Sequence, residues 1–167
     1  ELKSTDNTII SLDDIKGENG TLIMFICNHC PYVKAITKEI VEDCNELKKI
    51  GINSVAICSN DFINYPEDSF DNMIKFSKDN QFSFPYLQDE TQKIAKKYDA
   101  VCTPDFFGYD KDLGLQYRGR LRELKNFIPV KDGESDLLKA MKQIAETGKG
   151  PQDQIPSAGC GIKWKYD

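Results

Sequence analysis

Two of the six cysteines in this chain of 167 residues, Cys27 and Cys30, form a C-x-x-C pair. A cysteine thiolate is the nucleophile in thiol–disulfide exchange, so a site that lowers a thiol pKa can break or form disulfides. Asn28 and His29 separate the two cysteines, and their polarity predicts an exposed loop rather than a packed core. The pair is therefore the first candidate for redox chemistry.

Pro31 predicts where the pair lies relative to a helix. Proline favours the first helical position, and apolar residues at helical spacing run from Val33 to Leu47. Cys30 then caps the helix, where free backbone N–H groups and the helix dipole favour a thiolate. We therefore predict that Cys30 is the attacking thiol and that Cys27 lies upstream, in or near the preceding strand.

His29 is the only histidine of the chain. Beside Cys30 it could accept the thiol proton or stabilise the thiolate as an imidazolium. An exposed loop histidine without a chemical role is the alternative.

The elements around the pair predict an α/β fold. Residues 21–27 are apolar without alternation, which is typical of a central strand covered on both faces. A helix closed by Gly51 and a strand over 53–59 follow, and this β-α-β order predicts parallel neighbours. Before this unit, the pattern predicts a strand over 7–12. After it, the pattern predicts a helix over 67–78, an extended segment over 82–87, a helix over 89–98, a hairpin of 106–109 and 115–118, a helix over 135–146 and an irregular tail over 148–167.

This order resembles the thioredoxin-like fold with an N-terminal extension and a redoxin-type insertion. The resemblance covers nearly the whole chain and rests on residues 25–34 (FICNHCPYVK) and 101–107 (VCTPDFF). The tail 156–165 (PSAGCGIKWK) is similar to that of a bacterial redoxin group. The resemblance to TlpA-like thiol–disulfide proteins and AhpC/TSA proteins implies one domain over 1–167, with a central mixed sheet flanked by helices.

The C-x-x-C pair is out of phase with these relatives. Their first cysteine starts the helix and their second lies inside its first turn, where this chain has Val33. An alignment without a gap therefore keeps Cys30 as the attacking thiol, and we favour it. A gap would restore the usual phase with Cys27 attacking.

Residues 102–104 resemble the cis-proline loop that thioredoxin-like folds place beside the active cysteine. The resemblance implies that Pro104 is cis and that the backbone of Thr103 pairs with an extended substrate segment. Cys102 would then lie near the site, either as a thiol that resolves a Cys30 intermediate or as a small packed residue.

The remaining cysteines differ in their surroundings. Cys44 is on the apolar helix face and Cys58 is in a strand, so both are predicted to be core residues. Cys160 is in the tail and is more simply a bystander thiol. The alternative is a C-terminal resolving cysteine, as in peroxiredoxins, with Trp164 anchoring the tail over the site.

These observations favour a thiol–disulfide oxidoreductase in which Cys30 attacks and Cys27 or Cys102 resolves. A peroxiredoxin-like thiol peroxidase using Cys30 is the alternative, although the pattern of that family would need Thr or Ser at Cys27 and Pro at Ile23. A third interpretation is a zinc- or copper-binding module, whose soft ligands would come from Cys27, His29, Cys30 and either Cys102 or Cys160. We assign no cofactor and no metal to the leading function, and its partners are a thiol or disulfide substrate and a thiol reductant or oxidant.

The composition of the chain argues against a nucleic-acid-binding protein and against a membrane-spanning segment. The net charge is −5 and no basic run indicates nucleic-acid binding. The longest apolar run, Leu22 to Cys27, is too short to span a bilayer.

Arg118, Arg120 and Arg122 are interpreted as a solvated face. The cytoplasm is the default expectation, and a leader removed before Glu1 would instead indicate the periplasm.

Overall fold

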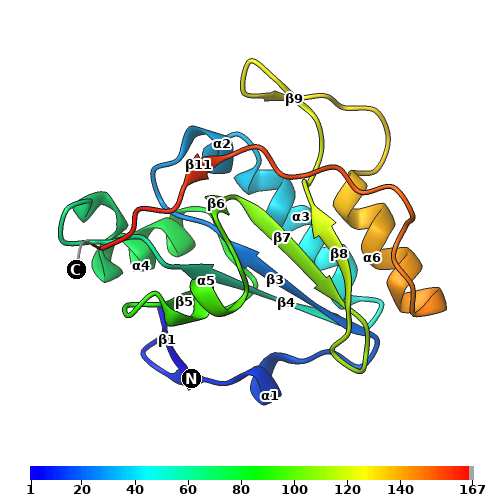
Figure 1. The fold of residues 1–167 in the computed structure, drawn as a ribbon, viewed down its shortest axis with the longest axis horizontal. Helices are drawn as coiled ribbons and strands as arrows, with labels where there is room; N and C mark the ends of the chain where they lie inside the picture. Colours follow the sequence, from blue (N-terminus) through cyan, green and yellow to red (C-terminus); the bar gives the residue numbers. More distant parts are fainter. Residues whose placement is uncertain (166–167) are drawn as a thin grey trace.

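A mixed seven-stranded sheet forms the centre of the structure, a computed structural model that describes residues 1–165 (Figure 1). Its strand order is β2-β1-β5-β4-β3-β7-β8. The strands are β1 (Leu2–Ser4), β2 (Ile9–Ile10), β3 (Gly20–Phe25), β4 (Ile52–Cys58), β5 (Tyr86–Gln88), β7 (Asp105–Tyr109) and β8 (Leu115–Gly119). The β3–β4 and β4–β5 pairs are parallel, whereas β7 pairs with β3 and β8 in antiparallel fashion.

Helices cover both faces of this sheet. They are α1 (Leu12–Ile15), α2 (Pro31–Lys34), α3 (Thr37–Lys48), the 3-10 helix η1 (Pro66–Asp68), α4 (Phe70–Asp79), α5 (Lys93–Lys97) and α6 (Asp136–Thr147). Two short strand pairs complete the structure: β9 (Leu124–Lys125) with β10 (Ile128–Pro129), and β6 (Cys102–Thr103) with β11 (Cys160–Gly161). The predicted mixed sheet flanked by helices, a thioredoxin-like arrangement, is confirmed.

Strand β3 contributes to both halves of the core. Leu22 and Met24 belong to the cluster that contains the apolar residues of α3 and α6. Ile23 and Phe25 point to the other side, into a cluster with Ala95 of α5. Successive side chains of a strand alternate between faces, so an unbroken apolar run requires cover on both sides. The predicted central strand is confirmed.

The helix after the cysteine pair is interrupted, whereas the sequence predicts one continuous helix. Helix α2 ends at Lys34, and Ile36 has φ −120° and ψ 3° before α3 begins. The Thr37 hydroxyl donates to the Val33 carbonyl at 2.7 Å. Such a bond to the carbonyl four residues earlier bends helices.

Other boundaries also differ from the prediction. The expected strand over 7–12 is only two residues long, and β1, which was not predicted, pairs with it. The helix expected from Asp89 begins at Lys93, and the Asp89 carboxylate instead accepts the Ala95 backbone N–H at 2.9 Å. The predicted hairpin and final helix are confirmed. Ser135 caps that helix by accepting the Leu138 N–H at 3.0 Å.

The prediction of a solvated arginine face is wrong for Arg122, which is only 8% exposed. Its guanidinium contacts both carboxylate oxygens of Glu39 in α3 and donates to the Val130 carbonyl at 2.7 Å. Arg118 and Arg120 form ion pairs as well, with Asp105 and Asp136. A charged side chain can be buried when it is paired and hydrogen-bonded.

The tail, predicted to be irregular over 148–167, is irregular along most of its described part but includes β11. Its last two residues lie outside the described part of the chain. Ile162 is buried in the core cluster beside α5, and its N–H donates to the Val101 carbonyl at 3.0 Å. The tail is therefore packed against the body of the protein, and in Figure 1 it crosses the end of the sheet beside β6.

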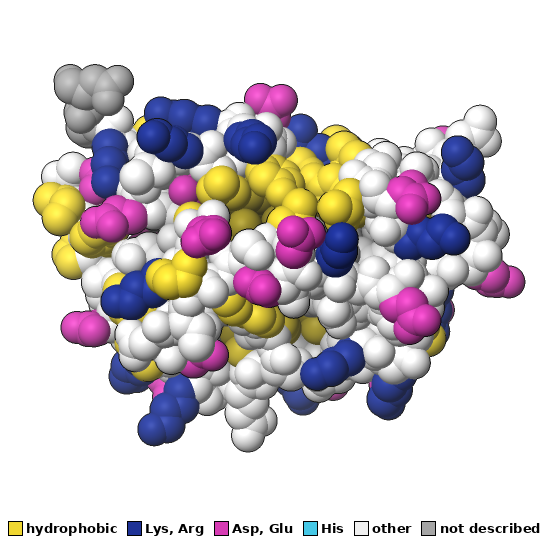
Figure 2. All heavy atoms as spheres, turned by 90° about the horizontal axis from the view of Figure 1, so that it is seen from below, with side chains coloured by type: hydrophobic (Ala, Val, Ile, Leu, Met, Phe, Trp, Pro, Cys, Tyr) yellow, Lys and Arg dark blue, Asp and Glu magenta, His cyan; other side chains and the backbone are white. Residues whose placement is uncertain are grey.

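The face seen from below in Figure 2 has a mixed surface. Acidic and basic side chains are interspersed there around a central group of hydrophobic side chains. Within residues 1–165, the helices are all too short or too polar for a membrane-crossing segment.

Candidate active site

Cys30 occupies the position before the first residue of α2. Its backbone is extended, with φ −67° and ψ 126°, and Pro31 occupies the first helical position as predicted. The residue is fully buried. Its Sγ atom lies 3.4 Å from the Thr103 carbonyl oxygen and 2.9 Å from the Sγ atom of Cys160. Cys30 is therefore held where α2, β6 and β11 meet.

The surroundings of Cys30 favour its thiolate. A hydrogen bond from the Cys27 thiol is the largest effect that holds the pKa of Cys30 well below its usual range. The Cys160 thiol and the backbone N–H groups of Val33 and Cys160 act in the same direction, while burial opposes them. Hydrogen bonds to a charged form favour that form. The pKa of Cys30 is accordingly lower than that of Cys27.

Cys27 has the opposite tendency. Its Sγ atom lies 3.4 Å from the Thr103 hydroxyl. The hydrogen bond to Cys30, burial and the negative charge of Asp68 all raise the pKa of Cys27. Cys27 therefore stays protonated and acts as the donor in the pair.

The prediction of an exposed loop between the cysteines is wrong, since Asn28 is 8% exposed. The Asn28 backbone N–H donates to Asp68 Oδ1 at 2.8 Å. Its side chain donates to the Glu67 carbonyl at 3.1 Å and accepts from the Tyr86 hydroxyl at 2.8 Å. A polar side chain can be buried when its hydrogen-bonding groups are satisfied, and Asn28 meets that condition.

His29 is partly exposed and is oriented by its neighbours. Its Nδ1 atom lies 2.8 Å from Asp68 Oδ2, and its ring stacks on Tyr65 with the planes 5° apart. No hydrogen bond joins His29 to Cys27 or Cys30 in the described residues. The predicted proton transfer between His29 and Cys30 is therefore not built into this arrangement.

Asp68 is a site residue that the sequence analysis missed. It ends η1, distant in sequence from the cysteine pair, and only the fold brings it beside Cys27 and His29. The potential ligand atoms of these three residues all lie within 4.8 Å of one another. Cys30, and both Cys102 and Cys160, one of which the metal-binding interpretation also requires, are outside this group.

The loop before β7 supplies a second wall of the site. The Thr103–Pro104 peptide bond is cis. Through its carbonyl and hydroxyl, Thr103 contacts both Cys30 and Cys27. The Cys102 sulfur, in contrast, faces the carbonyl oxygens of Pro104 and Ser157 at 3.7 and 3.9 Å. Burial raises the pKa of Cys102 to about 11.

Cys160 is in direct contact with Cys30 through their sulfur atoms. Strand β11 pairs antiparallel with β6 and sets Cys160 opposite Thr103. Burial and the neighbouring Cys30 raise the pKa of Cys160 to about 11. The sequence alone favoured a bystander thiol here, and the structure instead brings Cys160 into the site.

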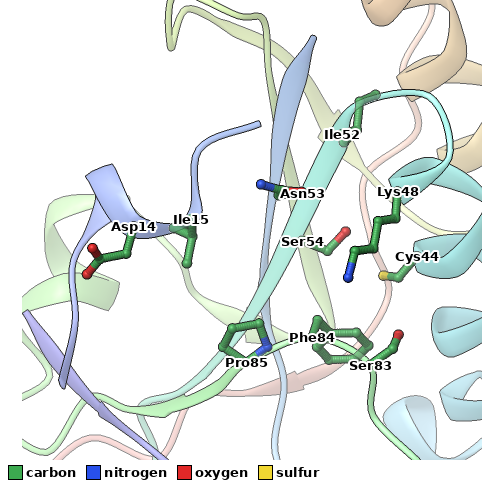
Figure 3. A pocket seen from close by; sticks show the side chains of 10 residues that line it. All are labelled: Asp14, Ile15, Cys44, Lys48, Ile52, Asn53, Ser54, Ser83, Phe84 and Pro85. Atoms are coloured by element: carbon green, nitrogen blue, oxygen red, sulfur yellow. The ribbon is translucent and has the colours of Figure 1, made fainter. Parts of the chain in front are cut away.

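Cys44 and Cys58 lie in the core, as predicted. They are 4% and 2% exposed, and burial raises the pKa of each to about 12. Cys44 lines a cavity beside Lys48, at the end of α3, and Ser54, near the start of β4 (Figure 3). The cysteine pair follows the opposite end of the neighbouring parallel strand β3, so this cavity belongs to a different region.

Comparison with known structures shows two similar proteins of nearly the same extent. An uncharacterised conserved protein from Geobacillus kaustophilus is 43% identical, with a TM-score of 0.93, over 99% of this chain and 88% of that one. A hypothetical protein from Sinorhizobium meliloti is 32% identical, with a TM-score of 0.91, over 99% and 91%. No curated protein matches the sequence significantly.

A more distant similarity supports the fold. A secreted disulfide oxidoreductase from Mycobacterium tuberculosis aligns with a TM-score of 0.58 and 15% identity, over 69% of this chain and 78% of that one. The sequence model of the AhpC/TSA family matches residues 1–121, which include the cysteine pair and the cis-proline loop. With its thioredoxin-like fold, the chain belongs to the AhpC/TSA family.

Proposed function

We propose that this protein is a thiol–disulfide oxidoreductase in which Cys30 is the attacking thiol. The observation that carries the proposal is the position of the Cys30 sulfur, directly before α2 and 3.4 Å from the Thr103 carbonyl that precedes cis-Pro104. The lowered pKa of Cys30 adds to this, because the thiolate is the form that attacks a disulfide. The fold similarity to a disulfide oxidoreductase agrees with the same chemistry.

In the first step, the Cys30 thiolate attacks one sulfur of a substrate disulfide. A bond forms between Cys30 and that sulfur, the substrate disulfide breaks, and the other substrate sulfur leaves as a thiolate that takes up a proton. The substrate is a small or protein disulfide. A thiol donor then returns the protein to its reduced state, and no step requires a cofactor.

A second thiol must release the bound half of the substrate. Of the two thiols that the sequence indicates, Cys27 is favoured, because it is the group that most lowers the pKa of Cys30, whereas the Cys102 sulfur faces backbone carbonyls. Attack by Cys27 first requires it to lose a proton, which burial and the charge of Asp68 disfavour. Resolution by Cys27 is therefore slow by comparison with attack by Cys30.

Reaction with hydroxyethyl disulfide tests the proposal. Mass spectrometry of the reduced protein after brief exposure should find the adduct on Cys30, and the variant Cys30→Ser should form none. Cys58→Ala is the matched control for loss of a buried thiol and should react like the parent. An adduct that forms first on Cys27 would refute the assignment and restore the alternative phase of the pair.

Membership of the AhpC/TSA family favours peroxide as a second candidate substrate. Cys30 would attack one peroxide oxygen, the O–O bond would break, and the other oxygen would leave as water, so that Cys30 becomes a sulfenic acid. Two thiols would then reduce the sulfenic acid, forming a disulfide and a second water. The hydrogen-bond partners of Cys30 are thiols and backbone groups, and no arginine among residues 1–165 hydrogen-bonds to its sulfur. Hydrogen peroxide in the same assay separates the two: a disulfide oxidoreductase consumes the disulfide faster, and a peroxidase the peroxide.

A further inference from the structure

The tail residues 156–161 cross the active site as a strap held at both ends. Before the strap, the Ile155 carbonyl accepts the Arg120 N–H at 2.9 Å. After it, Ile162 is buried, and the Lys163 carbonyl accepts from the Asp61 N–H at 2.8 Å and the Gln92 side chain at 2.9 Å. The strap is therefore placed by contacts outside the site itself.

The strap occupies the main-chain edge of β6, where an extended substrate segment is expected to pair. Cys160 pairs with Thr103 and Gly161 pairs with Cys102 in an antiparallel arrangement. Added strands use such edges because unpaired N–H and C=O groups there can bond to an extended segment. While the strap is docked, this edge is occupied and Cys30 is fully buried.

The strap also brings a thiol to the reacting sulfur. Cys160 Sγ lies 2.9 Å from Cys30 Sγ, although the two residues are 130 positions apart. A disulfide bond is about 2.05 Å long, so less than about 1 Å of sulfur movement would join them. Cys160 is partly exposed, whereas Cys27 is buried.

We propose that the strap is an internal occupant of the substrate edge and that Cys160, rather than the slower Cys27, is the thiol that resolves the Cys30 intermediate. The proposal rests on the attack by Cys30 described above. The strap leaves the edge to admit the substrate and returns when the mixed disulfide has formed.

The resolving step is a second thiol–disulfide exchange. The Cys160 thiol loses its proton and its sulfur attacks Cys30 Sγ. The bond between Cys30 and the substrate breaks, and the substrate sulfur leaves as a thiolate that takes up the proton. Two substrate thiols have then formed, and the two electrons come from the Cys30 and Cys160 thiols, which become a disulfide.

The two glycines that flank Cys160 provide a matched pair of variants. A Cβ atom at Gly159 would lie 2.2 Å from the Thr103 carbonyl oxygen, a contact with backbone that requires the strap to move. A Cβ atom at Gly161 would meet nothing within 4 Å. Gly159→Ala therefore displaces the strap without removing a thiol, and Gly161→Ala is its control.

The test is a disulfide map of the full chain by mass spectrometry after limited oxidation with diamide, together with alkylation of the reduced protein. We expect a Cys30–Cys160 disulfide in the parent and in Gly161→Ala. In Gly159→Ala we expect less of this disulfide and alkylation of Cys30 at least about fivefold faster, because the local opening that exposes it becomes more frequent. In Cys160→Ser the adduct of hydroxyethyl disulfide on Cys30 should persist at least about tenfold longer.

A parent protein that forms only Cys27–Cys30, with Cys160 still free to alkylate, would overturn the strap proposal and leave the attack by Cys30 intact. Equal alkylation of Cys30 in the two glycine variants would also overturn it. If Cys30 fails to react in every variant, both the strap and the proposed function are refuted.

Discussion

Two regions of this protein bury cysteines to the same degree with opposite chemical results. Cys30, at the start of α2, is 0% exposed and has a lowered pKa, whereas Cys44, in the middle of α3, is 4% exposed and has a raised pKa. The difference lies in the partners. Both cysteines belong to the same apolar cluster, but Cys30 has thiols and backbone N–H groups around its sulfur, whereas burial dominates the pKa of Cys44. Burial alone therefore does not determine the reactivity of a thiol.

The largest expected effect on the reaction rate is the loss caused by removing the Cys30 thiol, compared with removing the Cys44 thiol. Cys30→Ser should lower the rate of disulfide reduction by about 10³-fold or more, since it removes the nucleophile. Cys44→Ala should leave that rate within about twofold, because its sulfur takes no part in the exchange. The rates are measured as consumption of hydroxyethyl disulfide by the reduced protein. Similar decreases in the reaction rate in both variants would show that the two cysteines do not differ in their role.

A smaller effect is expected from the charge beside Cys27. Asp68 raises the pKa of Cys27, so Asp68→Asn should lower that pKa and increase the alkylation of Cys27 at neutral pH by about threefold to tenfold. The sign follows because a lower pKa gives more thiolate at a fixed pH. Asp79→Asn, an exposed carboxylate whose ion pair with Lys75 is at the surface, is the control. Unchanged labelling of Cys27 would show that Asp68 acts only by holding the loop.

The smallest effect concerns stability in the core region. Cys44→Ala should lower the free energy of unfolding by about 1 kcal/mol, because the lost sulfur leaves a small space among packed side chains. Denaturant unfolding followed by circular dichroism measures it. Since Cys44 borders the cavity of Figure 3, the surroundings can relax and keep the cost low. A loss above about 3 kcal/mol would mean that Cys44 has a larger structural role than burial alone.

The position of Cys30 could be predicted because its determinants are local. Pro31 and the apolar spacing after it indicate where a helix begins. The cover on both faces of β3 could also be predicted, because an apolar run without alternation permits little else. Both inferences depend on residues within a few positions of one another.

The contacts that complete the site depend on long-range packing and could not be predicted in the same way. Cys160 is in a tail without hydrophobic periodicity, and its position is decided by the free edge of β6, far away in sequence. Asn28 was expected to be exposed because its partners, Asp68 and Tyr86, come from other loops and strands. Likewise Arg122 is buried only because Glu39, 83 positions away, neutralises it.

The most direct test of the account is the pH dependence of alkylation at all six cysteines, followed by mass spectrometry on the reduced protein. The lowered pKa predicts that Cys30 is labelled first and keeps its neutral-pH rate into mildly acidic solution, losing it only as the pH falls through that pKa. Cys44 and Cys58 should be labelled only after unfolding. A Cys30 rate that rises only near the pKa of a free thiol, about 8.5, or faster labelling of Cys27, would contradict the account.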